Sequence, residues 1–311
     1  MDSAWAFLQE MVHLYIIALI GFIVRKMGVL NQDTDYVLTQ LILYVTLPAL
    51  ILFSLDIPFS FSLMKEFLLL LGMSAYILLL SIFLAGWMRR RSILVDRQKS
   101  VYEGLIIFGN QGYIGFAVIF AVFGEQGIVY LTMFNLIYFI LIWTYGIYLF
   151  TKDKAQIAWR NIILNPGVVS TLTGILVLFL PISWPGLLTN TFESVGKMTV
   201  PLSMILIGSL IANITYQDFG SLMKNTYIWK AVILKLLIIP LLLLPFGAFS
   251  IPFSLLMIAV LTAGMPSAPT MSLYAQKFGG DTHFASLGVM ISSLLGVLTI
   301  PLLYIVLHLI H

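Results

Sequence analysis

Long apolar stretches follow one another along nearly the whole chain, and short polar or Gly/Pro-rich segments separate them. A helix that crosses the hydrocarbon core of a bilayer needs about 20 mostly apolar residues. Ten stretches meet this requirement, and we number them as spans one to ten: 5–24, 36–55, 63–88, 101–122, 126–150, 162–180, 190–212, 226–248, 253–276 and 284–308. The pattern predicts an all-α integral membrane protein with ten transmembrane helices.

The composition excludes a soluble fold. Apolar residues make up 60% of the 311 residues and charged residues only 9%, against about 45–50% and 25% in soluble domains. So few charges could not cover the surface of a soluble domain of this size. The mean hydropathy of +1.04 leads to the same conclusion.

Other counts narrow the chemistry. The chain has no Cys, which excludes disulfides and thiolate metal sites, and its four His are dispersed. We therefore expect no metal and no cofactor. The net charge of +3 does not indicate nucleic-acid binding, because the basic residues lie in short segments between spans.

The distribution of Lys and Arg predicts the orientation in the membrane. The odd-numbered loops contain 12 of the 16 basic residues, the even-numbered loops contain only Lys65 and Lys197, and Lys230 and Lys235 lie inside span eight. Loops rich in Lys and Arg face the cytoplasm. We therefore expect a multi-pass protein of the cell membrane with both termini outside.

Three pairs of similar segments indicate an internal repeat. The segments are separated by 153, 153 and 155 residues: Gly21 with Gly174, Pro48 with Pro201, and Phe123-Gly124 with Phe278-Gly279. A repeat of five spans is odd in number, so the second copy must enter the membrane from the opposite side. We expect a 5+5 inverted repeat, with residues 1–150 as the first copy and 151–311 as the second.

Span four is interrupted in its middle by Asn110, Gln111, Gly112 and Gly115. Gly and Asn are poor helix formers, and amide side chains in hydrocarbon are costly unless they are hydrogen-bonded. Irregular backbone at membrane depth is tolerated where it lines a cavity or is buried in protein. The interruption therefore predicts a broken helix, although Gly109, Gly112 and Gly115 could instead serve close helix packing.

Span nine is interrupted at the equivalent depth by Pro266, Ser267, Pro269 and Thr270. Two prolines remove backbone donors and break the helical ladder, although a single proline could merely kink the helix. Matching breaks in two halves of a carrier are the best indication of its binding site in the sequence. We therefore predict that the two breaks form the substrate-binding site.

The second half-helix of each broken span should begin near the bilayer midplane, close to Phe116 and Thr270. Both N-termini carry free amides and the positive ends of helix dipoles. The preceding half-helices place their negative C-terminal dipole ends at the same point, so the dipoles alone would also permit a cation. Lys235 lies about ten residues into span eight and would add positive charge at this depth. The balance favours an anion, with a structural bond from Lys235 to a broken-helix carbonyl as the alternative.

These motifs resemble those of the auxin efflux carrier family, which includes PIN-like proteins and bacterial malate or malonate carriers. The resemblance covers nearly the whole chain and rests on Leu47-Pro48, Gly109-Asn110, Gly115, Pro201-Leu202-Ser203-Met204, Gly208, Lys235, Pro240, Met265-Pro266-Ser267, Ala275, Phe278 and Gly279. It implies a scaffold domain of spans 1, 2, 6 and 7 and a transport domain of spans 3–5 and 8–10.

The resemblance also implies export of small organic anions by an elevator-type movement, and a homodimer. It places Asn110 and Pro266 in the two crossovers, and Pro48, Pro201 and Ser203 on the scaffold side of the site. Family members commonly have Pro where this chain has Ala117. The loop between spans five and six is short, which resembles a bacterial-type carrier.

Three other functions compete with anion export. A sodium- or proton-coupled symporter of the bile acid carrier type would share the scaffold, although no Asp or Glu lies deep in a span. An intramembrane enzyme would need a base near Ser267, and the sequence offers none. A non-transporting sensor would be supported by a fused signalling domain, and no such domain is evident.

Overall fold

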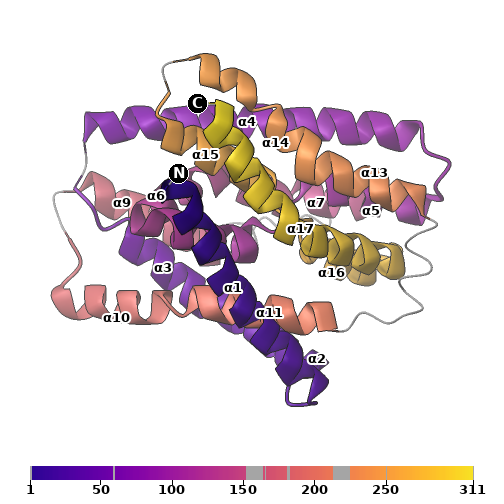
Figure 1. Cartoon of the computed structure of the whole chain (residues 1–311), viewed down its shortest axis with the longest axis horizontal. Coiled ribbons are helices and arrows are strands. Elements are labelled where there is room, and N and C mark those ends of the chain that lie inside the picture. The colour runs from indigo at the N-terminus through magenta and orange to yellow at the C-terminus, as the bar shows by residue number, and fades with distance from the viewer. Residues whose placement is uncertain are drawn as a thin grey trace. The chain divides into compact units, whose positions relative to one another are not determined.

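A computed structural model describes residues 2–58, 60–151, 164, 166–180, 183–212, 225–249 and 251–310, with side chains from residue 9 onward. These residues form helices and no strand, which confirms the all-α prediction. The basic residues Lys152, Lys154, Arg160 and Lys224, which contributed to the predicted orientation, lie outside the described residues. Figure 1 labels the helices.

The first half of the chain contains α1 (Asp2–Lys26), α2 (Gln32–Leu41), η1 (Ile42–Thr46), α3 (Leu47–Ser54), α4 (Phe61–Arg90), α5 (Asp96–Ile107), η2 (Gln111–Gly115), α6 (Phe116–Trp143) and α7 (Tyr145–Thr151). The second half contains α9 (Pro166–Phe179), α10 (Gly186–Gly196), α11 (Thr199–Ala212), α13 (Thr226–Ile233), η4 (Leu234–Ile238), α14 (Ile239–Leu241), η5 (Leu244–Ala248), α15 (Phe253–Ala263), α16 (Thr270–Phe278) and α17 (Thr282–Ile310). Of the η elements, η1, η2 and η4 are π-helical and η5 is a 3₁₀-helix.

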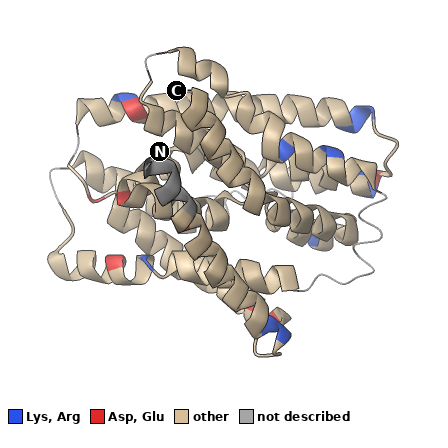
Figure 2. Ribbon diagram, viewed as in Figure 1, with Lys and Arg blue, Asp and Glu red and all other residues tan. Residues whose placement is uncertain are grey.

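Six helical runs in the described part of the chain are long and apolar enough to cross a membrane: Gln32–Ser54, Phe61–Arg90, Gln111–Thr151, Gly186–Ala212, Thr226–Ala248 and Thr282–Ile310. Two shorter apolar helices, α9 and α15, lie in predicted spans six and nine. Charged residues are sparse along these helices (Figure 2). The structure confirms a multi-pass helical membrane protein, while the count of ten spans stays a prediction.

The chain divides into two compact units. The first contains Met1–Leu71, Gly112–Phe139 and Arg160–Asn213, and the second contains Gly72–Gln111, Ile140–Trp159 and Ile214–His311. Predicted spans one, two, six and seven fall in the first unit. The second unit contains Asn110 and Gln111 of the break in span four and the whole break in span nine.

Glycine allows the helices of the first unit to approach at backbone distance. α1 crosses α11 (Figure 1), and a Cβ atom at Gly21 would overlap the Ile205 carbonyl while one at Gly208 would overlap the Ala18 carbonyl. Small residues at such crossings are typical of membrane helices, because packing rather than the hydrophobic effect holds these helices together. The two glycines thus fix the α1–α11 contact.

Glycine also sets two helix boundaries. Gly124 has φ 61° and ψ −149° and separates the end of span four from the start of span five, although helical hydrogen bonding continues across it as α6. Gly279 has φ 76° and ends α16. Positive φ is costly for residues with a Cβ atom, so glycine is the expected residue at both positions.

Two prolines are preceded by a turn of π-helix. The Leu47 N–H donates to the Ile42 carbonyl just before Pro48, and the Ile239 N–H donates to the Leu234 carbonyl just before Pro240. Proline lacks an N–H and interrupts the i→i−4 ladder, and a π-turn is one way in which a helix accommodates the change. The second of these turns contains Lys235.

Candidate functional site: a crossover of two broken helices beside a buried lysine

The two interrupted segments pair with each other inside the second unit. α5 ends at Ile107, and Phe108 turns to extended backbone with φ −94° and ψ 115°. Gly109 and Ser267 then form an isolated antiparallel β-bridge. The Asn110 N–H donates to the Pro266 carbonyl at 2.5 Å, and the Ala268 N–H donates to the Phe108 carbonyl at 2.9 Å. Each break therefore satisfies backbone groups that the other leaves open.

The span-nine side of the crossover is held by side chains as well. Gly264 caps α15, and helical structure resumes at Thr270 after Pro269. The Ser267 hydroxyl donates to the Leu105 carbonyl at 2.7 Å, and the Ser267 N–H donates to the Ser292 hydroxyl at 3.0 Å. Ser267 is therefore a tie between helices in this structure, and the extended segment is fixed from two sides.

Pro266 packs tightly against α17. The ring is buried, and a Cβ atom at Gly296 would come within 2.6 Å of the Pro266 Cγ. Proline at this position cannot donate a hydrogen bond, which favours the extended backbone over a helix. The crossover thus depends on the missing donor of Pro266 and on the space left by Gly296.

Lys235 lies directly against the crossover. Its side chain is 2% exposed, and its Nζ donates to the Ile107 carbonyl over a long 3.4 Å. A Cβ atom added at Gly109 would lie 3.0 Å from the Lys235 Nζ. No carboxylate in the described part of the chain forms an ion pair with this lysine. An unpaired ammonium group therefore lies beside the end of α5.

Asn110 and Gln111 place two amide side chains at the same junction. They are 3% and 2% exposed. Asn110 Oδ1 and Gln111 Oε1 have no hydrogen-bond partner among the described residues. Because a buried polar group costs free energy unless it is bonded, these amides are candidates for binding a polar ligand.

The second half-helix of span four begins where it was expected, because α6 starts at Phe116. Helical backbone already resumes at Gln111, with the π-turn η2 that precedes α6. This π-turn accommodates Gly112 and Gly115, so these glycines are helical and the extended break covers only 108–110. Gly112 and Gly115 belong to the first unit, whereas Asn110 and Gln111 belong to the second.

The residues expected on the scaffold side all lie in the first unit. Pro48 is in the first turn of α3 and Pro201 in the first turn of α11. Ser203 is fully buried in α11, and its hydroxyl is without a partner in the part of the chain that is described. The relation of these three residues to the crossover stays a prediction.

Sequence reasoning missed a buried acidic group in the second unit. Glu103 of α5 is 2% exposed, accepts from Arg89 Nη1 at 2.8 Å and accepts from the Tyr145 hydroxyl at 2.7 Å. Glu103 lies within a turn of the start of predicted span four and was therefore not counted as a deep acidic residue. The available signal was a single Glu within an otherwise apolar segment of α5. The Glu103 carboxylate forms an ion pair with Arg89 and accepts a second hydrogen bond from Tyr145. Glu103 therefore connects α4, α5 and the segment at Tyr145.

Two comparisons with known proteins complete the description. The model of the membrane transport protein family, which includes the auxin efflux carriers, matches residues 6–159 and 153–304. The chain is also similar to the uncharacterized transporter MJ1031 of Methanocaldococcus jannaschii, with 22% identity over 202 residues. That match covers 62% of this chain and 65% of the relative, less than two thirds of its length.

Proposed function

The chain belongs to the membrane transport protein family, and from that premise we propose that it exports small organic anions by an elevator-type alternating-access mechanism. It is a transporter and not an enzyme. The substrates that we propose are carboxylates, such as malate-, malonate- or auxin-like anions. The crossover in the second unit would bind the anion and carry it during transport.

The observation that carries this proposal is the lone ammonium group of Lys235 beside the paired breaks. Its Nζ reaches only a carbonyl at 3.4 Å, so its charge is left without an opposite charge in the described structure. A buried charge is costly unless it is paired. A carboxylate at the crossover would supply that charge, and the free amides at the start of η2 and α16 would add positive dipole ends.

The neighbouring amides supply the rest of a recognition site. Asn110 and Gln111 carry donors as well as acceptors, and their acceptor oxygens are unsatisfied among the described residues. Rotation of an amide could present its NH₂ group to a carboxylate oxygen. Pro266, Ser267, Pro269 and Thr270 would hold the opposite wall, with Ser267 serving mainly as a tie.

Several features support the inverted repeat on which an elevator mechanism would rest. Gly124 and Gly279 are separated by 155 residues, and both end a half-helix with positive φ. Gly21 packs against Ile205 of α11, while Gly174, 153 residues later, packs against Leu55 at the end of α3. Equivalent glycines thus serve equivalent contacts between spans one and seven and between spans six and two.

We further propose that the first unit contains the scaffold of spans one, two, six and seven, and that the second carries the crossover. A homodimer through the scaffold, residence in the cell membrane and outward-facing termini complete the proposal. The basic odd-numbered loops support the orientation.

Transport driven by membrane potential alone is the expected mode. Lys235 would provide positive charge at the crossover, and Glu103 is held by Arg89 and Tyr145 rather than left free to carry a coupling proton. An anion that leaves a cell with a negative interior gains about 2.3 kcal/mol per charge per 100 mV. At about 1.4 kcal/mol per decade, this sustains roughly a fifty-fold concentration ratio.

The test uses purified protein in liposomes, with the potential set by a potassium gradient and ionophore. Proton and sodium gradients are held at zero, and efflux of a labelled carboxylate is followed. The flux should follow the imposed potential and reverse with its sign. Flux that ignores the potential but requires a sodium or proton gradient would replace this mode with the symporter alternative.

A further inference from the structure

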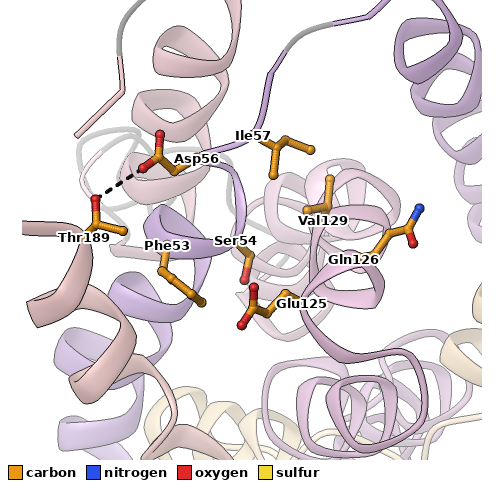
Figure 3. Close-up of a pocket in the computed structure, with 8 residues that line it drawn as sticks. All are labelled: Phe53, Ser54, Asp56, Ile57, Glu125, Gln126, Val129 and Thr189. Carbon is orange, nitrogen blue, oxygen red and sulfur yellow. Dashed lines mark hydrogen bonds between the residues drawn. The ribbon is translucent and has the colours of Figure 1, made fainter. Parts of the chain in front are cut away.

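A cavity of about 410 Å³ is lined by residues of the first unit (Figure 3). Its lining combines two carboxylates, other polar side chains and an apolar wall: Asp56, Glu125, Ser54, Gln126, Thr189, Phe53, Ile57 and Val129. Clefts of about 300–1,000 Å³ with a mostly apolar lining and a few polar groups are typical of small-molecule sites.

Local sequence explains why these side chains meet. α3 ends at Ser54, and the chain leaves the helix through Leu55 and Asp56. Gly124, with its positive φ, turns the chain so that Glu125 and Gln126 begin the following helical segment. Thr189 of α10 donates a hydrogen bond to Asp56 Oδ2 at 3.3 Å and holds the third side of the cavity (Figure 3).

The charge balance around the cavity is negative. Lys197 forms salt bridges with two acidic residues. Its Nζ lies 2.5 Å from Glu193 Oε1 and 3.9 Å from Glu125 Oε1. Asp56 receives only the Thr189 hydroxyl among the described residues and forms no ion pair there. Three carboxylates therefore share one ammonium group, which leaves two negative charges uncompensated among these four side chains.

Ser54 supplies an independent sign of a missing partner. It is 2% exposed, and its hydroxyl has no hydrogen-bond partner in the described part of the chain. Figure 3 shows this hydroxyl on the cavity wall, turned toward the side where the Glu125 carboxylate lies. Because an unbonded buried hydroxyl is unfavourable, a ligand with a donor group would satisfy it.

We propose that this cavity binds a small organic amine, with its ammonium group between Asp56 and Glu125 and its apolar part against Phe53, Ile57 and Val129. An ammonium group has three donors, which matches the two carboxylates and the Ser54 hydroxyl. A metal ion fits less well, because the described residues contain no group of three His, Asp or Glu side chains arranged to hold one. The apolar wall and the volume also suit an organic body.

The test measures binding of phenethylamine to the purified protein by isothermal titration calorimetry, with 3-phenylpropionate as the ring-bearing anion of opposite charge. The amine should bind saturably and the acid should not. Asp56→Asn and Glu125→Gln should each weaken amine binding at least tenfold. Lys197→Gln should tighten it several-fold, because it removes the competing cation. Asp33→Asn, an exposed carboxylate on α2, is the matched control and should change the affinity less than twofold.

One further variant keeps the proposal open to refutation. Ser54→Leu removes the hydroxyl and places a larger apolar side chain on the cavity wall, so it should abolish amine binding. Melting temperatures of all variants establish that each is folded. The proposal is overturned if phenethylamine does not bind the wild-type protein. It is equally overturned if folded Asp56→Asn and Glu125→Gln bind the amine as the wild type does.

Discussion

Replacement of Lys235 separates its charge from its hydrogen bond. Lys235→Gln removes the charge and keeps a donor for the Ile107 carbonyl. Lys235→Met removes both and retains a long unbranched side chain. If the charge binds substrate, both variants should lose affinity for anions; if the lysine is only a structural tie, Gln should behave like the wild type and Met should be destabilised.

The structure gives the expected size of each effect. The 3.4 Å bond to Ile107 is longer than the usual 2.7–3.2 Å, so its loss should cost no more than about 1 kcal/mol. An unpaired buried charge costs several kcal/mol. Without ligand, Lys235→Met should therefore be as stable as the wild-type protein or more stable.

Binding should change in proportion to ligand charge. At an effective dielectric constant of about 20, a carboxylate within about 4 Å of the ammonium group gains at most about 4 kcal/mol, and a second carboxylate at about 7–8 Å adds about 2 kcal/mol. The variants should therefore weaken binding of malonate about thirtyfold more than binding of propionate. Isothermal titration of the detergent-purified variants measures both affinities, and melting temperatures measure stability.

Two results would refute this reasoning. Equal losses of affinity for malonate and propionate would show that Lys235 does not act through its charge. A melting temperature that falls in Lys235→Met but not in Lys235→Gln, with anion binding unchanged in both, would make the lysine a structural tie.

Four other substitutions test the crossover, its packing and the α1–α11 contact. Asn110→Ala should reduce transport at least tenfold in a protein that still inserts and melts normally, whereas unchanged kinetics would give this residue a packing role only. Gly296→Ala should destabilise the wild-type protein by about 1–3 kcal/mol, because the new methyl group meets the Pro266 ring. The same substitution should be tolerated in the Pro266→Ala background. Equal losses of stability in both backgrounds would show that the two residues do not contact each other. Pro266→Ala alone should lose transport, because the restored N–H lets the two half-helices join, and normal transport would count against the crossover. Gly208→Ala should lower the melting temperature strongly, because its Cβ overlaps the Ala18 carbonyl; a melting temperature equal to that of the wild type would contradict the α1–α11 contact.

The features that the sequence predicted are those set by local chemistry. Gly124, Gly279 and Pro266 interrupt helices through their own backbone preferences, so the interruptions could be placed without a structure. The length and apolar composition of each span are likewise local properties of the sequence. The π-turn at Gln111–Gly115, which precedes α6, was not predicted, because glycine permits more than one helical geometry.

The rest depends on contacts between residues far apart in the chain. Nothing near Gly109 indicates that it pairs with Ser267, and nothing near Glu103 indicates Arg89 and Tyr145 as its partners. The amine cavity is equally hidden, since its acids belong to helices that meet only in the folded first unit. Contacts between residues that are far apart in the chain leave no pattern in the local sequence, so only the structure identifies them.

Counterflow in proteoliposomes detects carrier-mediated movement of an anion whatever the coupling. Vesicles that contain the purified protein are loaded with an unlabelled carboxylate and diluted into a trace of the same carboxylate with a radioactive label. We expect transient accumulation of label for at least one carboxylate of a panel that includes malate, malonate and indole acetate, and less accumulation in Asn110→Ala and Lys235→Gln. Absence of accumulation for every carboxylate in the panel, with folded protein in the vesicles, would contradict organic anion transport by this chain.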